Sequence, residues 1–304
     1  MFRKLSLIIL MSIIFLNACT KNNVKKDAYK YVVGVSVPNV REPWIASMSE
    51  EISTFFLEND VNVIYKDSAG DDKKQIADIK SLINSGVDLL IIIPQKSFDL
   101  AKEIELINNK IPIIIAGSDP LTDKYLCFIH FDDYGIGKEL GEYAINNYSN
   151  ENFNDFNLVV LEGPKDSLIS LERLRGFNET VAQKMDNKNI TYFYGDWLRD
   201  KAEDRVKDYL IENESPNIII SFNDEMAYGA YIASNKLKAI KPLFIGVGGF
   251  ESEHGGKNLV DLGILDATIR CPGFGSLTAK TALKILKGET VPDKISLKGE
   301  LYIK

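Results

Sequence analysis

Residues 218–231 read IIISFNDEMAYGAY, and this stretch indicates the class of the fold. The first four residues form a short, mostly apolar run that suits a strand covered on both faces. Asn223, Asp224 and Glu225 follow, and from Met226 the apolar residues recur with helical spacing. A buried strand that passes through polar residues into a helix is the repeating unit of parallel α/β sheets.

The same unit recurs along the chain. Short runs rich in Val and Ile predict strands at YVVGVSV (31–37), VNVIY (61–65), DLLIII (88–93), IPIIIA (111–116), NLVVLE (157–162), ITYFY (190–194), NIIIS (217–221), LFIGV (243–247) and LDATI (265–269). Helical spacing predicts helices at 44–57, 73–83, 100–107, 137–145, 174–185, 202–210, 226–237 and 277–286. This alternation predicts a doubly wound α/β fold.

The repeated units exceed one sheet of ordinary size, so two similar sheets are expected, with a polar surface loop at 146–157. Ligands of open α/β sheets bind beyond the carboxyl ends of the strands. The polar residues of the opening stretch stand at such an end.

Composition argues against several classes of function. The chain has 304 residues, 45% hydrophobic and 26% charged, with a net charge of −7, so nucleic acid is not an expected partner. Three Cys residues without CxxC spacing give neither a disulfide framework nor a zinc site. The segments GVGGFES and GIGKELG do not complete a nucleotide-binding GxGxxG motif, and His130 and His254 lack metal or triad motifs. We expect no catalytic residue, cofactor or metal.

The first nineteen residues resemble a bacterial lipoprotein signal. Arg3 and Lys4 precede an apolar run that is shorter than a membrane-spanning helix, and Leu-Asn-Ala-Cys at 16–19 resembles a lipobox. We therefore expect residues 1–18 to be removed, Cys19 to carry lipid and residues 19–30 to form a polar tether. The alternatives are an uncleaved anchor helix and a Cys that occurs at this position by chance. The protein is expected outside the cytoplasm, anchored to a bacterial membrane in the periplasm or at the cell surface.

Several segments together resemble the type I periplasmic sugar-binding proteins, the ribose- and galactose-binding class. They are VGVSVPNVREPWIASM, LINSGVDLLIIIPQKS, NKIPIII, GDWLRDKA, SFNDEMAYGA and LKGETV, and the resemblance covers 31–304. It implies two Rossmann-like doubly wound parallel-sheet lobes joined by a three-crossover hinge. One lobe would comprise 30–131 plus 272–297 and the other 132–271 plus 298–304. Repressors share this fold, but in them a helix-turn-helix stands where this chain has the signal segment.

The resemblance implies ligand contacts for two aromatic residues and one amide. Trp44 and Trp197 occupy positions, on opposite lobes, where aromatic rings stack on the apolar face of a sugar ring; the alternative is that both are core or lobe-surface residues. Asn223 matches an amide that binds sugar hydroxyls. Its alternative role is the N-cap of the following helix, for which we expect Asp224 instead.

The resemblance implies ligand contacts less directly for the charged candidates. Arg41 lies in the loop of Trp44 and is either a ligand contact or a solvated side chain. The family's ligand-binding Arg corresponds to Leu171, so Arg173 is a displaced candidate that helix packing would also explain. Asp119 and Arg270 are candidates to replace polar groups that the family carries nearby. Those groups are missing because the matching positions hold Ile93, Gly117, Gly248 and Cys271.

These features together predict a lipid-anchored solute-binding protein rather than an enzyme. It would capture a small polar, carbohydrate-like ligand between two lobes and deliver it to an ABC permease. The alternative is a ligand sensor that signals to a membrane histidine kinase or chemoreceptor. A monomer is expected in either case.

The first prediction concerns the anchor. We expect Cys19→Ala to leave the protein soluble or unprocessed, because the substitution removes the thiol that would carry lipid. Membrane fractionation and sequencing of the mature N-terminus check this. Unchanged membrane association together with an unchanged N-terminus in Cys19→Ala would contradict the lipobox interpretation.

Overall fold

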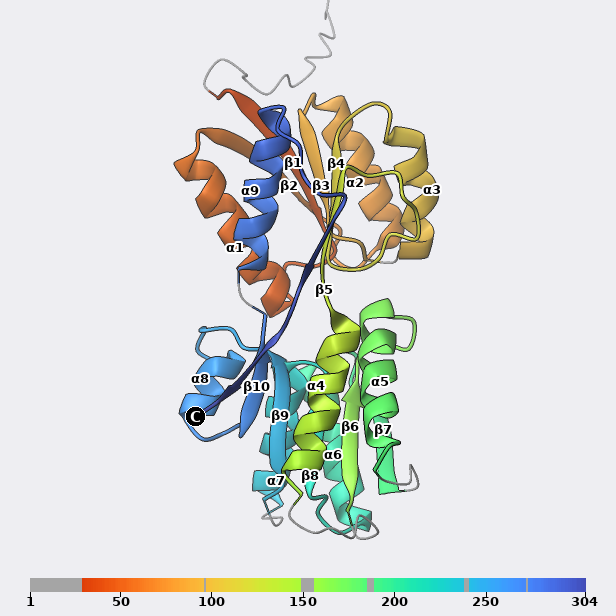
Figure 1. The fold of residues 1–304 in the computed structure, drawn as a ribbon, viewed down its shortest axis with the longest axis vertical. Helices are drawn as coiled ribbons and strands as arrows, with labels where there is room; N and C mark the ends of the chain where they lie inside the picture. Colours follow the sequence, from red (N-terminus) through yellow and green to blue (C-terminus); the bar gives the residue numbers. More distant parts are fainter. Residues whose placement is uncertain (1–28, 96, 149–155, 185–188, 238–240, 272) are drawn as a thin grey trace, which may run out of the picture.

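The computed structural model describes residues 29–95, 97–148, 156–184, 189–237, 241–271 and 273–304. Within these residues the chain forms two six-stranded sheets, each in its own lobe, and the lobes are stacked end to end (Figure 1). Cys19 lies outside the described residues. No helix among the residues searched is long and apolar enough to cross a membrane.

The first sheet has the order β11-β5-β4-β3-β1-β2, and its paired strands are all parallel. Its strands are β1 (Tyr31–Val37), β2 (Val61–Asp67), β3 (Leu89–Ile92), β4 (Ile113–Ala116), β5 (Cys127–Phe131) and β11 (Lys294–Leu297). In Figure 1, helices α1 (Pro43–Glu58) and α9 (Phe274–Leu286) lie on one side of it, and α2 (Asp72–Asn84) and α3 (Ser97–Ile107) on the other. Both faces are therefore covered, which is why β3 and β4 are buried along their whole length.

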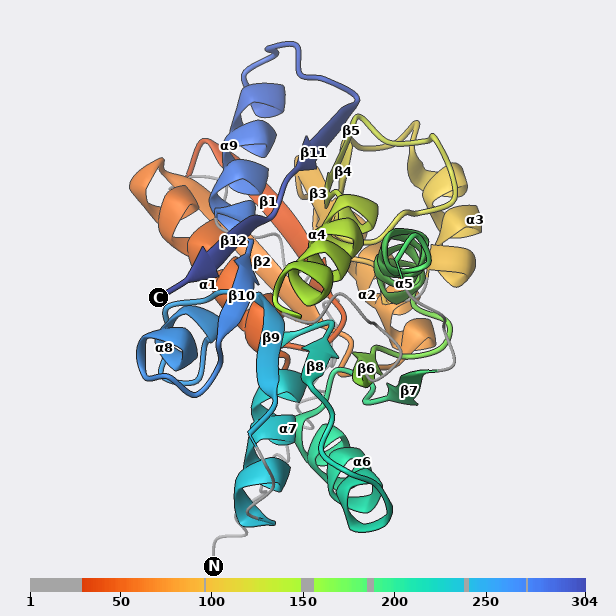
Figure 2. The ribbon, with the colours of Figure 1, turned by 60° about the horizontal axis from the view of Figure 1, so that its bottom comes forward.

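The second sheet repeats this order as β12-β10-β9-β8-β6-β7, with β12 antiparallel to β10. Its strands are β6 (Leu158–Glu162), β7 (Ile190–Tyr194), β8 (Ile218–Ser221), β9 (Leu243–Gly248), β10 (Ala267–Arg270) and β12 (Glu300–Ile303). Its helices are α4 (Asp133–Asn146), α5 (Leu168–Val181), α6 (Arg199–Glu212), α7 (Asp224–Lys236) and α8 (Gly256–Asp261). Figure 2 shows the same lobe from a second direction, with α4 and α5 on one side of the sheet and α6 and α7 on the other.

The chain passes between the lobes after β5, after β10 and between β11 and β12. Since β5 and β10 run parallel to their inner neighbours, the carboxyl ends of both sheets face the junction of the lobes. Two contacts tie these connections together. The ring of Phe131 stacks on Phe274 with centroids 5.0 Å apart, and the Asp132 N–H donates to the Leu297 carbonyl at 2.8 Å.

Helix α1 illustrates how the sequence selects its buried face. Its buried residues are Ile45, Met48, Ile52 and Phe56, which recur every three or four positions and so form one stripe. Glu50 and Leu57 lie off this stripe and are exposed. The stripe packs on the first sheet together with α9.

Helices α4 and α5 approach each other closely enough to exclude side chains at two positions. A methyl group at Gly137 would overlap the Arg173 carbonyl, and one at Gly176 would overlap the Tyr134 carbonyl. The two helices therefore pack backbone against backbone. This close contact brings Asp133, at the start of α4, beside Arg173 on α5.

The predicted α/β fold with two parallel-sheet lobes is confirmed, and each of the nine predicted strands coincides with an observed one. Four short elements were not predicted from the sequence: β5, β11, β12 and α8. β11 and β12 are four-residue edge strands with no residue fully buried, so they lack the continuous apolar pattern of inner strands. α8 has six residues, too few to show a helical period.

The second prediction follows from the contact between α4 and α5. An Ala normally stabilises a helix interior relative to Gly by about 0.5–1 kcal/mol, but Gly176→Ala should lower the free energy of unfolding by about 1–3 kcal/mol because the methyl group overlaps the Tyr134 carbonyl. Chemical denaturation measures this effect. Glu172→Ala, at an exposed position of the same helix, is the control and should change stability by about 0.5 kcal/mol or less. A stabilised Gly176→Ala variant would show that the helices are further apart.

Candidate functional site

The order of strands identifies one position in each sheet where a ligand would bind. In the first sheet β1 has β2 on one side and β3 on the other, and in the second sheet β6 has β7 on one side and β8 on the other. The loops after β1 and β3 therefore diverge, as do those after β6 and β8, and the crevice between such loops is the usual ligand position of open α/β sheets. These loops and their neighbours at the same strand ends are the first to consider.

Trp44 lies in the loop after β1, at the start of α1, and is half-buried. Its ring approaches Gly117 so closely that a methyl group there would be 3.3 Å from Trp44 Cη2, and it meets Phe274 edge-on with centroids 6.4 Å apart. The indole also hydrogen-bonds the side chain of Glu42, whose pKa is raised by burial and lowered in part by this bond. The polar edge of the ring is therefore satisfied within its own loop.

Trp197 lies in the loop after β7 of the second lobe, just before α6. Its ring lies against the backbone of Gly163, which follows β6, so that no side chain fits at that position. Asp196 and Trp197 have φ of 53° and 67°, a left-handed conformation that is unfavourable for large side chains. Strain of this kind costs about 1–3 kcal/mol and is concentrated at functional sites, so the loop is a candidate for ligand contact.

Asn223 is the N-cap of α7, which corrects the prediction that Asp224 caps this helix. The Asn223 side-chain oxygen accepts a hydrogen bond from the Met226 N–H at 2.9 Å. Its Nδ2 donates to the Trp197 carbonyl at 3.1 Å and so stabilises the strained loop that contains Trp197. The predicted ligand contact of Asn223 remains a prediction, and one N–H of the amide is left for it.

Asp224 is buried behind the loop that follows β9. Its Oδ1 accepts a hydrogen bond from the Thr268 hydroxyl at 2.7 Å, and its Oδ2 accepts one from the Gly249 N–H at 2.6 Å. Asp224 was wrongly predicted as the cap because the carboxylate, one residue past the cap position, points to other strands instead.

Arg173 is buried and makes an ion pair. Its Nε and Nη2 lie 2.9 Å from Asp133 Oδ1, and its Nη1 donates to the Phe222 carbonyl. Burial raises the pKa of Asp133, and the adjacent Arg173 opposes that shift. The guanidinium carbon also lies 5.9 Å from the centroid of the Trp197 ring. These contacts are the helix-packing role that the sequence analysis kept as an alternative.

The remaining charged candidates lie nearer the surface. Arg41 is exposed, and the Asp119 carboxylate is engaged locally by the Leu121 N–H at 2.7 Å. Arg270 lies at the end of β10 with its guanidinium carbon 5.7 Å from the centroid of Tyr302 and its Nη2 3.6 Å from Glu251. Their ligand-binding roles remain predictions.

Two of the positions where the family's polar groups are missing, Gly117 and Gly248, are closed to side chains. Gly117 and Gly248 have φ of 95° and 135°, which only glycine adopts readily. A methyl group at Gly248 would lie 3.2 Å from the ring of Phe250, a residue that the sequence analysis did not single out. Aromatic rings thus stand beside glycines after β4, β6 and β9.

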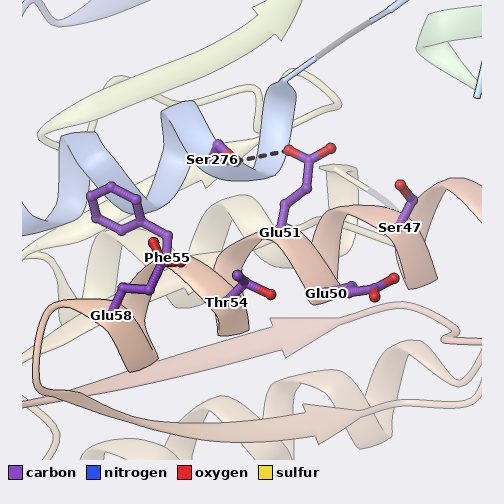
Figure 3. Close-up of a pocket in the computed structure, with 7 residues that line it drawn as sticks. All are labelled: Ser47, Glu50, Glu51, Thr54, Phe55, Glu58 and Ser276. Atoms are coloured by element: carbon purple, nitrogen blue, oxygen red, sulfur yellow. Dashed lines mark hydrogen bonds between the residues drawn. The ribbon is translucent and has the colours of Figure 1, made fainter.

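A separate groove lies on the outer face of the first lobe, between α1 and α9 (Figure 3). Its lining is Ser47, Glu50, Glu51, Thr54, Phe55, Glu58 and Ser276, and none of these was predicted from the sequence. Glu51 is already engaged there, since it accepts a hydrogen bond from the Ser276 N–H at 2.9 Å. We therefore place the candidate site at the strand ends. No metal-binding group of His, Cys, Asp or Glu occurs among the residues searched.

Comparison with known proteins agrees with this geometry. The model of the periplasmic binding protein domain family matches residues 33–290. The chain belongs to the periplasmic binding protein family. The ribose import binding protein RbsB of Escherichia coli is 26% identical over 298 residues, 97% of each chain. The xylitol-binding protein of Mycolicibacterium smegmatis is 25% identical over 281 residues, 91% of this chain and 78% of that protein.

A solved structure gives the same result. The fructose-binding periplasmic domain of a hybrid two-component system superimposes with a TM-score of 0.81 at 26% identity, covering 90% of this chain and 91% of the other. The resemblance to type I periplasmic sugar-binding proteins is thereby confirmed. These relatives are binding proteins, in line with a binding function for this family member.

The third prediction separates the two roles of Asn223. Asn223→Ala should lower the free energy of unfolding by about 0.5–2 kcal/mol, because the helix loses its cap and the Trp197 carbonyl loses its donor. Asn223→Asp keeps a cap acceptor and loses only the donor, so it should retain more stability than the alanine variant. Thermal unfolding of the empty protein measures both variants. Equal stability of wild type and Asn223→Ala would contradict the capping contact.

Proposed function

We propose that the protein is a lipid-anchored extracytoplasmic solute-binding protein that binds a small polar, carbohydrate-like ligand between its lobes. The observation that carries this proposal is the placement of Trp44, after β1, and Trp197, after β7, at the carboxyl ends of the two sheets, each ring beside a glycine. A sugar ring has one face rich in C–H groups, which needs an apolar partner. Ring surfaces on two facing lobes would supply that partner once the lobes close.

Binding would act by a shift between open and closed arrangements of the lobes, with no chemical step. Contacts that the ligand makes to both lobes exist only in the closed arrangement, so the ligand stabilises it. The closed, monomeric protein would then deliver the ligand to an ABC permease. The ribose import binding protein among the relatives supports delivery for transport.

Sensing is the second candidate function. It is favoured by the similarity to the fructose-binding periplasmic domain of a hybrid two-component system. In that case the closed lobes would be recognised by a membrane histidine kinase or chemoreceptor. Uptake of a radiolabelled ligand in cells with and without the protein distinguishes the two: transport requires a loss of uptake in the deletion strain.

Thermal-shift screening against sugars, polyols, nucleosides and amino acids tests the proposed binding. A sugar or polyol should raise the melting temperature, and the shift should vanish in Trp44→Ala and Trp197→Ala. Phe55→Ala, in the outer groove, is the matched aromatic control and should keep the shift. Stabilisation only by amino acids, or a shift that survives both Trp substitutions, would argue against the proposal.

The fourth prediction is that ribose binds poorly. Gly117, Gly248, Leu171 and Cys271 stand where the family carries hydrogen-bonding side chains, and three or more lost partners at about 1 kcal/mol each imply at least about a hundredfold lower affinity. Calorimetry with D-ribose measures this directly. Sub-micromolar binding would show that other groups, such as Asp119 or Arg270, replace the missing ones.

A further inference from the structure

The carboxylate of Asp224 joins elements that are distant in sequence. Asp224 is the first residue of α7, yet it accepts hydrogen bonds from Thr268 on β10 and from Gly249 in the loop after β9. The amide of Gly256, at the start of α8, also donates to it. One buried side chain therefore connects two helices, a strand and the loop that faces the junction of the lobes.

Three glycines enclose this carboxylate. Methyl groups at Gly246 and Gly256 would overlap its oxygens, and one at Gly248 would lie 2.7 Å from Oδ2. The space that side chains would fill at these positions is thus taken by Asp224 itself. Since residues 248–250 lie in the candidate site, the position of the loop there depends on this one carboxylate.

We propose that Asp224 is a positioning residue for ligand binding: its ionised carboxylate holds residues 248–256 in the binding arrangement, and protonation releases them and weakens binding. This inference rests on the proposed function, since it concerns the same site. The Gly249 and Gly256 amides can only donate, whereas the Thr268 hydroxyl can also accept. A proton on the oxygen that faces the amides would break a bond to the backbone, and a proton on Oδ1 would require the Thr268 hydroxyl to turn and accept it. In either form the neutral acid is a weaker acceptor for the amides than the carboxylate.

The carboxyl group of Asp224 is protonated in a pH range that binding measurements can reach. Burial raises the pKa of Asp224 to about 6, while the bonds from Thr268, Gly249 and Gly256 act in the opposite direction and the like charge of Glu225 on the same helix adds to the rise. Cys271, after β10, stays a neutral thiol because burial raises its pKa to about 12. A ligand that binds only when residues 248–256 are held in place favours the ionised form of Asp224. The affinity for such a ligand should therefore fall as the pH drops through about 6.

The fifth prediction tests this by calorimetry at pH 5 to 8 with four probes: L-arabinose, D-fructose, myo-inositol and xylitol. For any probe that binds, affinity should fall by about fivefold or more from pH 7 to pH 5. Asp224→Asn should bind about tenfold more weakly at pH 7 and show no such pH dependence, because a neutral carboxamide, like the protonated acid, is a weaker acceptor for the backbone amides than the carboxylate. His130→Asn, which removes the histidine outside residues 248–256, is the control and should keep the wild-type profile.

Thr268→Val is the milder variant in case Asp224→Asn does not fold. It removes one donor to the ionised carboxylate, so the midpoint of the pH profile should move to higher pH. A folded Asp224→Asn protein with wild-type affinity and pH profile would overturn the inference. So would an unchanged midpoint in Thr268→Val.

The Gly249 amide gives a readout that needs no ligand. Its NMR shift should titrate with a midpoint near 6 in the wild type and stay constant in Asp224→Asn. A constant shift in the wild type would overturn the inference. If the amide titrates but none of the four probes binds at any pH, the proposed sugar-like ligand is wrong and the carboxylate's hold on the loop is still supported.

Discussion

The chain leaves both sheets at the carboxyl ends of their strands, and the positions of all the candidate residues depend on this constraint. A parallel sheet presents the loops that enter its helices at one edge. Because the connections after β5 and β10 start from that edge in each lobe, the two edges must face each other. The stacking of Phe131 on Phe274 and the bond from the Asp132 N–H to the Leu297 carbonyl hold the three connections side by side. Trp44 and Trp197, separated by about half the chain, are placed at facing edges as a consequence.

The inner strands could be predicted from the sequence because each buries both faces. The runs of β3 and β4 are apolar at every position, and that of β8 is apolar except for Ser221. The edge strands β11 and β12 carry no such run, since one side of an edge strand contacts solvent. β5 was missed for another reason: its five residues include the polar His130, so the run is not continuously apolar. The His130 ring stacks on Phe128, two residues earlier on the same face of the strand, with centroids 4.6 Å apart.

The exchange of roles between Asn223 and Asp224 shows where local rules fail. Asn and Asp are equally good N-caps, so the residue type alone does not decide which of two neighbours caps a helix. Which of the two caps the helix is decided by the hydrogen-bond partners of Asp224. Thr268 and Gly249 are distant in sequence, and only the pairing of β9 with β10 brings them to Asp224. A sequence pattern does suggest such a site, since Gly246, Gly248 and Gly256 are the glycines that leave room for the carboxylate, but without the fold they indicate only turns.

The charges near the candidate site are largely neutralised within the protein. Arg173 is paired with Asp133, and Asp224 is bound by three donors, so none of these groups depends on a ligand for a partner. What the loops offer instead is ring surface: Trp44 beside Gly117, Trp197 on Gly163 and Phe250 beside Gly248. An aromatic face binds a C–H-rich surface without directional bonds, while hydroxyls of a sugar left unpaired would cost about 1–3 kcal/mol each. A carbohydrate-like ligand would therefore have to find its polar partners among the remaining candidates, such as Arg270 and the second N–H of Asn223.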